Sequence, residues 1–167
     1  MNFNADSQGR FEAGALILRC AIGKGGMVAA ADKREGDGAS PVGRWPLRYV
    51  LYRPDRGAAP ATALPVRPLA EDDGWCDDPA HPDYNRPVKR PFPASHEAMW
   101  RDDHLYDIVV VLGHNDDPPR PPLGSAIFLH LAKPDYAPTE GCIALARADL
   151  EAVLALAAPG DALEIRP

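Results

Sequence analysis

Proline is the residue type that most restricts the fold of this chain, which carries 19 prolines among 167 residues. A proline inside a helix removes a backbone hydrogen bond and costs about 3 kcal/mol, so few stretches can form a long helix. The sequence therefore favours a loop-rich, mainly β protein over a helical bundle. A chain of this length buries a sizeable core without disulfides, and we interpret residues 1–167 as a single domain.

Short apolar runs between turn residues predict the strands of this fold. Ile108–Leu112 is continuously apolar and short, as in a buried central strand, and Ser125–His130 is a second such run. Residues Pro54–Pro68 predict an irregular connection. The remaining strands are expected in four segments: Ala15–Ile22 and Met27–Ala31, paired as a hairpin around a glycine-rich turn, and Trp45–Tyr52 and Ala162–Ile165.

The sequence predicts one clear helix and one long functional loop. Leu150, Val153, Leu154 and Ala157 recur at helical spacing, which predicts a helix over about 150–158. Residues Gly74–Arg101 are dense in Trp, His, Arg and Pro, and predict an ordered flap over a site, with an ordinary exposed loop as the alternative. The expected fold is a mainly β, mostly antiparallel sandwich with at least one packed helix and a long loop or flap region.

One cysteine lies in a turn that suits nucleophilic catalysis. Cys142 follows Gly141 and comes twelve positions after His130. Acyl transfer by a cysteine needs a thiolate, an imidazole that keeps it deprotonated, and backbone N–H groups where the oxyanion forms. Gly141 allows a tight turn beside the sulfur, because glycine takes positive φ without steric cost. The alternative is a buried structural cysteine, and the residues alone leave both interpretations open.

The other two cysteines are weaker candidates for a nucleophile. Cys20 lies in an apolar strand, and Cys76 in an acidic loop where Asp77 and Asp78 would raise the pKa of its thiol. An odd number of cysteines spread along the chain fits free thiols in a reducing compartment rather than a disulfide framework. Of the three cysteines, Cys142 is therefore the one with a plausible general base, His130.

Charge and hydropathy restrict which partners and which cellular location the sequence is compatible with. A net charge of −6 without a Lys/Arg cluster argues against nucleic acid, and no stretch approaches the roughly 18 apolar residues that span a bilayer. The first residues carry neither a basic nor an apolar region of a signal peptide. We therefore expect no membrane partner and a cytoplasmic location, or a periplasmic one if a leader was removed.

The motifs around Cys142 resemble those of the L,D-transpeptidase catalytic domain (YkuD-like). That family carries a His followed, after a short loop, by Ser/Thr-x-Gly-Cys, which His130 and Thr139–Cys142 match. The segment Ser40–Gly43 is similar to the family's T-P-x-G, with Ser40 in the Thr position, and residues 150–165 to its closing helix, glycine turn and last strand. The matches come in the family's order and span about residues 14–165.

Two positions depart from the family pattern. The family usually has a second His just before Gly-Cys, where this chain has Glu140, and an Arg two residues after the Cys, where it has Ala144. A carboxylate at Glu140 is expected to raise the pKa of the Cys142 thiol, unless it faces a basic partner or the substrate's amine. The third residue of a peptidoglycan stem carries a free amino group, which would suit that carboxylate.

The resemblance implies a ping-pong acyl transfer on peptidoglycan tetrapeptide stems without metal or cofactor. Cys142, with His130 as base and the Gly141–Cys142 turn at the oxyanion, would attack the L-centre of stem residue 3 and release terminal D-Ala. A neighbouring carbonyl, that of Leu131 here, would orient the imidazole. The resemblance also implies a covalent carbapenem adduct at Cys142.

The acceptor separates two activities. An amine of another stem gives a cross-link or an exchanged D-amino acid in the periplasm, as in an L,D-transpeptidase. Water gives an L,D-carboxypeptidase, which would trim soluble muropeptides during recycling in the cytoplasm. The absence of a visible leader favours water as the acceptor.

Further residues are candidates for contacts with the stem. His114, which follows the Ile108–Leu112 strand, is either a second active-site imidazole or a hydrogen-bonded turn residue. Arginines bind carboxylates bidentately, so a guanidinium from the flap is expected to hold a stem carboxylate, and nothing in the sequence selects among three of them. The full set of candidate substrate contacts is His114, Thr139, Glu140, Trp75, Tyr84 and Arg86, with Arg90 and Arg101 as further arginines.

Three rival functions remain open on the sequence. His114, His130 and Cys142 could bind zinc, although their spacing matches no familiar site. A non-catalytic module that binds wall fragments would keep the flap but not need His130 and Cys142 together. A cysteine-dependent amidase of other peptides would use the same nucleophile.

Overall fold

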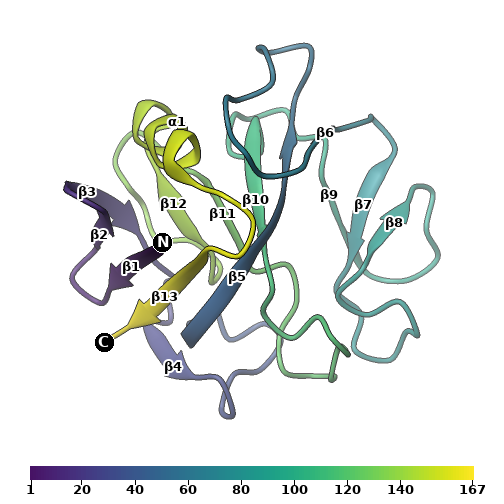
Figure 1. Ribbon diagram of the computed structural model, residues 1–167. Coiled ribbons are helices and arrows are strands. Elements are labelled where there is room, and N and C mark those ends of the chain that lie inside the picture. The colour runs from purple at the N-terminus through teal and green to yellow at the C-terminus, as the bar shows by residue number, and fades with distance from the viewer.

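The computed structural model describes residues 1–167 as thirteen strands and one helix (Figure 1). In chain order the elements are β1 (Asn2–Asp6), β2 (Arg10–Ala13), β3 (Leu16–Ala21), β4 (Met27–Ala29), β5 (Ser40–Tyr52), β6 (Val66–Pro68), β7 (Asp73–Cys76), β8 (Pro87–Lys89), β9 (His96–Ala98), β10 (Ile108–Leu112), β11 (Phe128–Leu131), β12 (Ile143–Leu145), α1 (Arg147–Leu156) and β13 (Ala162–Arg166). The predicted mainly β fold with a packed helix is confirmed.

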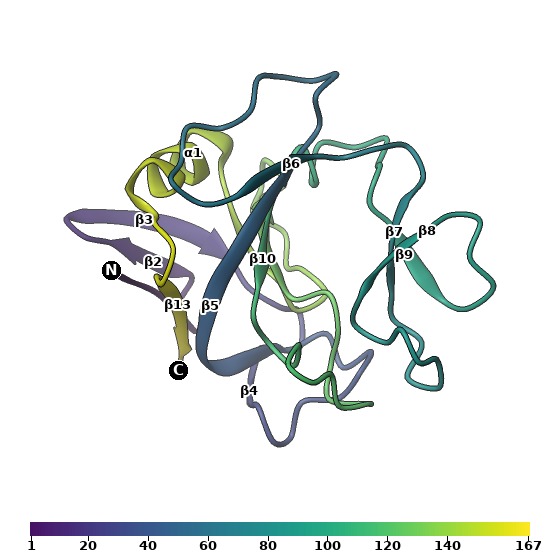
Figure 2. The same cartoon turned by 45° about the vertical axis from the view of Figure 1, so that its right-hand side comes forward.

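Two strands join the layers of the sandwich. The first half of β5 pairs with β13 over Gly43–Pro46, and its second half pairs with β10 over Leu47–Tyr52. Likewise β3 pairs with β2 through Leu16–Arg19 and with β12 through Cys20 and Ala21. The strand order β10-β11-β12-β3-β2-β1-β13-β5 therefore closes on itself through β5 and β10, as the two views in Figures 1 and 2 show.

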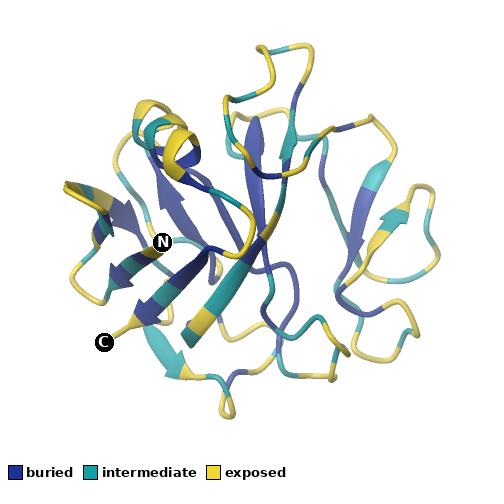
Figure 3. Cartoon of the chain, in the orientation of Figure 1, coloured by how far each residue is buried: buried dark blue, intermediate teal, exposed yellow.

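The core lies between the layers, and a second apolar cluster lies behind the central strand. All five residues of β10 are buried, as predicted for a central strand (Figure 3). Ile108, Val110 and Leu112 belong to the main core, whereas Val109 and Val111 belong to the second cluster, because successive strand residues face opposite sides. Helix α1 closes the main core with the apolar residues that predicted it.

The predicted flap is a small antiparallel sheet rather than a long loop. Strand β7 pairs with β8 on one side and with β9 on the other, and we call these three strands the flap sheet. It lies beside β10 on the right of Figure 1. Trp75 and Met99 pack into the second apolar cluster, so the flap sheet is fixed to the central strand by buried contacts.

The predicted hairpin between residues 15 and 31 is wrong. Strand β3 pairs with β2 and β12, while β4 runs parallel to β5. The glycine-rich turn lies against the segment before β5 instead: a Cβ at Gly23 would stand 2.4 Å from the carbonyl oxygen of Gly38, and one at Gly25 2.6 Å from that of Asp37. The glycines serve this close approach, a use that the sequence pattern does not separate from a hairpin turn.

Two other expectations need adjustment. The run Ser125–His130 becomes a strand only at Phe128, because Ala126 has φ of 54°, outside the β region. The irregular connection Pro54–Pro68 ends in the short strand β6, parallel to β5. No helix of the chain is long and apolar enough to span a membrane.

Candidate active site

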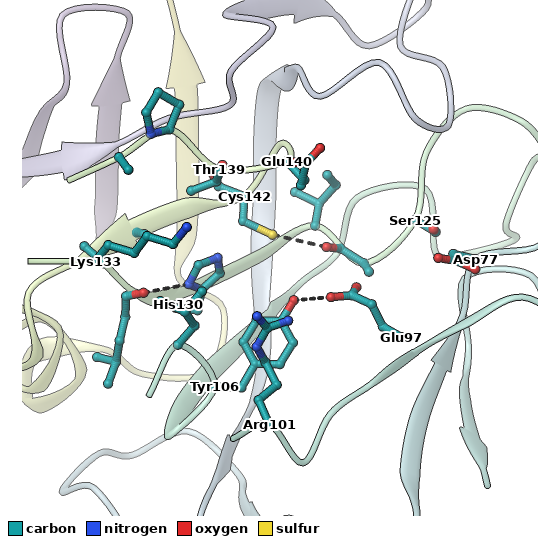
Figure 4. A pocket seen from close by; sticks show the side chains of 18 of the residues that line it. Asp77, Glu97, Arg101, Tyr106, Ser125, His130, Lys133, Thr139, Glu140 and Cys142 are labelled. Carbon is teal, nitrogen blue, oxygen red and sulfur yellow. Dashed lines mark hydrogen bonds between the residues drawn. The ribbon is translucent and has the colours of Figure 1, made fainter. Parts of the chain in front are cut away.

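A cavity of about 480 Å³ opens between the flap sheet and the ends of β11 and β12 (Figure 4). Cys142 and His130 both line this cavity, so the structure brings the two predicted catalytic side chains together. The rest of the wall comes from residues 33–36, Asp77, residues 97–106, residues 125–127 and the segment 131–144 around the two catalytic candidates. These segments follow or precede strands, as is usual for residues positioned by a rigid scaffold.

The turn that carries Cys142 is held by its own hydrogen bonds. The Thr139 hydroxyl donates to the carbonyl oxygen of Cys142 at 2.6 Å and accepts the Gly141 N–H at 3.1 Å. Gly141 has φ of 135°, and a Cβ there would stand 2.8 Å from the carbonyl oxygen of Ala39. The glycine is therefore required by both conformation and space. The hydroxyl of Thr139, a candidate substrate contact, is used within the turn.

Ser40 ties this turn to the start of β5. Its hydroxyl donates to the carbonyl oxygen of Gly141 at 2.8 Å and accepts the Gly23 N–H at 3.0 Å. Ser40 is fully buried. The Ser-Pro-x-Gly segment noted in the sequence thus has a defined role, which is to fix the backbone next to the sulfur.

The thiol of Cys142 is neutral and hydrogen-bonded to backbone. Sγ donates to the carbonyl oxygen of Ala126 at 3.2 Å and accepts the Phe128 N–H at 3.3 Å. Burial raises the pKa of Cys142 to about 12, and the nearby Glu97 carboxylate adds to the rise. Lys33 acts in the opposite direction. The resting thiol is therefore protonated, without a direct hydrogen bond to an imidazole.

The imidazole of His130 is held in one orientation. Nδ1 donates to the carbonyl oxygen of Leu131 at 2.9 Å, the partner anticipated from the family resemblance. The Tyr106 ring packs edge-on against the imidazole, with 5.3 Å between ring centroids. Burial lowers the pKa of His130 to about 4 against the smaller effect of the Leu131 bond. The ring is thus a neutral base whose Nε2 carries the free lone pair.

The flap sheet and the segment that follows it supply two charged groups to the cavity wall: Arg101, which is among the candidate arginines, and Glu97, which the sequence did not single out. Glu97, on β9, accepts a hydrogen bond from the Tyr106 hydroxyl. Burial raises the pKa of Glu97, although the Tyr106 bond and Arg101 oppose the rise. Of the three candidate arginines, only Arg101 lines the cavity, and it is paired bidentately with Asp103. The composition of Gly74–Arg101 pointed to this wall, but no local motif marks Glu97.

Glu140 does not act on the sulfur. Its carboxylate pairs with Lys24 Nζ at 2.8 Å, and its side chain is 79% exposed at the rim of the cavity. The structure meets the stated exception to the expected rise in the Cys142 pKa, because Glu140 faces a basic partner, Lys24, and the solvent. The carboxylate that has this effect is Glu97.

Four candidate substrate contacts lie away from the cavity. Tyr84 is fully buried and donates its hydroxyl to Glu35. Trp75 and Arg86 line a separate cavity of about 310 Å³, which Phe128 also lines. The structure therefore uses these flap residues for packing or for another surface.

His114, the fourth of these candidates, is also buried outside the cavity. Its ring packs edge-on against Trp45, with 4.7 Å between centroids, and its Nδ1 has no hydrogen-bond partner. It is neither a second imidazole of this cavity nor a hydrogen-bonded turn side chain. No group of three His, Cys, Asp or Glu side chains is arranged to hold a metal ion.

Comparison with known families agrees with the fold and with the position of the cavity. The L,D-transpeptidase catalytic domain (YkuD) matches residues 4–165 of the 167-residue chain. No curated protein and no solved structure matches the chain significantly. Because the match covers nearly the whole chain, the motifs around Cys142 and Ser40 belong to one continuous domain pattern. The chain belongs to the L,D-transpeptidase catalytic domain family, whose members carry out cysteine acyl transfer on peptidoglycan.

Proposed function

We propose that this family member is an L,D-carboxypeptidase of peptidoglycan tetrapeptide stems. Cys142 attacks the carbonyl at the L-centre of stem residue 3, terminal D-Ala leaves, and water releases the trimmed stem. The observation that carries the proposal is the single cavity lined by the Cys142 thiol and by an imidazole, His130, whose Nδ1 is already engaged by Leu131. That bond leaves Nε2 as the nitrogen available to move a proton.

The first half-reaction forms a thioester and breaks the peptide bond. The thiol leaves the Ala126 carbonyl and gives its proton to His130 Nε2 as Sγ bonds to the substrate carbonyl carbon. The Cys142 N–H donates no hydrogen bond within the chain, so it is available to the oxyanion, whereas the Gly141 N–H is held by Thr139. His130 then returns the proton to the departing amine of D-Ala.

The second half-reaction consumes water. His130 accepts a proton from the water that attacks the thioester, and the sulfur leaves with that proton as a thiol. The cavity that Cys142 lines has a volume of about 480 Å³, which suits one stem end and a small acceptor. An amine acceptor on a second stem would need an additional path into the cavity to reach the same sulfur. These features support water as the acceptor.

The proposal sets the reaction among soluble muropeptides in the cytoplasm. All three cysteines are unpaired and buried, which suits a reducing compartment. Recycled wall fragments there carry the tetrapeptide stem as a soluble substrate. The periplasmic alternative would supply polymeric wall and amine acceptors instead.

The test is incubation of the purified protein with a soluble disaccharide tetrapeptide, read by mass spectrometry, with Cys142→Ala in parallel. Loss of one D-Ala, absent in the variant, is the expected result. A cross-linked dimer, or exchange of added D-amino acids, would show that the protein is a transpeptidase rather than a carboxypeptidase. Binding that survives Cys142→Ala, without turnover by the parent protein, would favour a non-catalytic wall-fragment module.

A further inference from the structure

Glu97 is a carboxylate of the cavity that lacks a cationic partner. Its Oε1 accepts the Tyr106 hydroxyl, and its Oε2 has no hydrogen bond or ion pair within the chain. Arg101, the cation whose charge acts on Glu97, is committed to Asp103 through Nε at 2.8 Å and Nη2 at 2.6 Å. Glu97 is half-buried, so a ligand cation that reached it would be poorly screened by water.

The other carboxylates of the cavity are engaged differently. Glu35 accepts the hydroxyls of Tyr84 and Ser125 on one oxygen, and Glu140 pairs with Lys24 at the rim. Asp77 accepts the Ser95 hydroxyl. Glu97 is the one carboxylate whose charge is felt by the Cys142 thiol. It is therefore the acidic group placed to meet whatever is attached to the sulfur.

The position of His130 indicates which part of the substrate reaches Glu97. In Figure 4 the imidazole lies to the left of the Cys142 sulfur and the Glu97 carboxylate to its right, and both side chains line the cavity. Because His130 must protonate the departing amine, D-Ala leaves on the imidazole side. The residue that stays on the sulfur as an acyl group then extends toward Glu97.

We propose that Glu97 is a specificity-determining residue that binds the free side-chain ammonium group of the third stem residue. This inference rests on the proposed function, in which that residue is the acyl group on Cys142. The ammonium donates to Glu97 Oε2 while Oε1 keeps the Tyr106 hydroxyl. Such a charge-assisted hydrogen bond in a half-buried site selects the charged side chain over a neutral one of similar length by about tenfold.

Recognition at Glu97 is coupled to the nucleophile. Burial raises the pKa of Glu97, with Asp77 and Glu35 adding to the rise and Tyr106 and Arg101 opposing it. A bound ammonium group would therefore stabilise the ionised carboxylate of Glu97. That ammonium also cancels the charge with which Glu97 raises the pKa of Cys142. The preference is therefore expected in kcat as well as in KM.

The experiment compares two tetrapeptides that differ only in the charge of residue 3: L-lysine and Nε-acetyl-L-lysine. The ratio of their kcat/KM values for D-Ala release is measured for the parent protein, for Glu97→Gln and for Glu140→Gln. We expect a ratio of about ten in the parent, close to one in Glu97→Gln and parental in Glu140→Gln, since Glu140 is exposed and paired with Lys24. Glutamine keeps the acceptor for the Tyr106 hydroxyl, and urea midpoints check that both variants fold.

Calorimetric binding of the same peptides to Cys142→Ala, with and without Glu97→Gln, separates this inference from the proposed function. A parent ratio near one, or a ratio that Glu97→Gln leaves unchanged, would overturn the role of Glu97 while leaving the carboxypeptidase intact. Absence of turnover of both peptides would overturn the proposed function. In that case calorimetry decides on the ammonium site. The site is supported if Cys142→Ala binds the lysine peptide more tightly than the acetylated peptide and if adding Glu97→Gln removes this preference. It is overturned if there is no preference or if Glu97→Gln leaves the preference unchanged.

Discussion

The hydroxyl of Ser40 donates a hydrogen bond to the carbonyl oxygen of Gly141 at 2.8 Å, although the two residues are 101 positions apart in the chain. The same hydroxyl accepts the Gly23 N–H, so one buried side chain joins three segments next to the nucleophile. The Cys142 turn is thus positioned by β5 as well as by its own strand. Stability and catalysis are expected to share this contact.

Ser40→Ala is expected to lower the free energy of unfolding by about 1–3 kcal/mol, because a buried N–H and a buried C=O lose their partner together. Urea unfolding of the variant against the parent measures this loss. The control is Ser95→Ala, whose hydroxyl is exposed and binds only Asp77, and which should change stability by less than about 0.5 kcal/mol. Equal midpoints for Ser40→Ala and Ser95→Ala would show that the buried hydroxyl adds nothing.

Gly141→Ala tests the conformation of the turn. The new Cβ would stand 2.8 Å from the Ala39 carbonyl oxygen at a φ of 135°, so we expect a loss of roughly 2–4 kcal/mol and little D-Ala release. Gly57→Ala is the matched control, since Gly57 has open space around it and no positive φ. Thermal unfolding and the tetrapeptide assay on both variants give the comparison. A Gly141→Ala protein as active as Gly57→Ala would contradict the need for glycine beside the sulfur.

Local patterns predicted most elements of the fold, because each buries a recognisable face. The continuous run Ile108–Leu112 and the helical spacing of Leu150–Ala157 both became core elements. Pairing was harder. The segments Ala15–Ile22 and Met27–Ala31 are close in sequence, yet they do not pair with each other: β3 pairs with β2 and β12, and β4 pairs with the start of β5. The glycines between them pack against residues 37–40 instead. Such tertiary contacts leave no periodic signal.

The candidate site was partly predictable for a similar reason. Cys142, Gly141 and His130 lie in one motif within 13 residues of the chain, so the sequence itself carries their proximity. Glu97 comes from a separate sheet and enters the cavity only through the packing of Trp75 and Met99 on the central strand. His114 shows the converse, because a strand-end position did not place its ring in the cavity.

Two buried histidines make stability depend on pH. Burial lowers the pKa of His114 and of His130 to about 4, from a usual 6.5. Between these two pH values the unfolded chain binds more protons than the folded one, so stability falls as the pH is lowered from about 6.5 to about 4. Each histidine contributes on the order of 3 kcal/mol to this loss.

Urea unfolding of the parent and of His114→Asn at pH 7 and pH 4.5 measures the effect. The His114 variant is less stable at pH 7, since a packed ring is lost, but its stability should fall less between the two pH values. If the stability of His114→Asn fell between the two pH values by as much as that of the parent, the result would contradict a neutral, buried imidazole at His114.

Alkylation of Cys142 tests the charge that faces the nucleophile. Burial and Glu97 hold the pKa of the thiol up to about 12, so iodoacetamide should react slowly at neutral pH and faster at each higher pH. Glu97→Gln removes the electrostatic part, lowers the thiol pKa, and should speed modification at pH 8 by on the order of tenfold. Peptide mapping by mass spectrometry separates Cys142 from the two other cysteines.

Glu140→Gln is the control for this measurement, because Glu140 pairs with Lys24 at the exposed rim and does not act on the thiol. Its alkylation curve should overlay that of the parent. If both variants shifted the curve equally, the effect would be one of net charge rather than of position. A shift in Glu97→Gln alone would establish that Glu97 opposes formation of the thiolate in the free enzyme, which a bound ammonium group would then relieve.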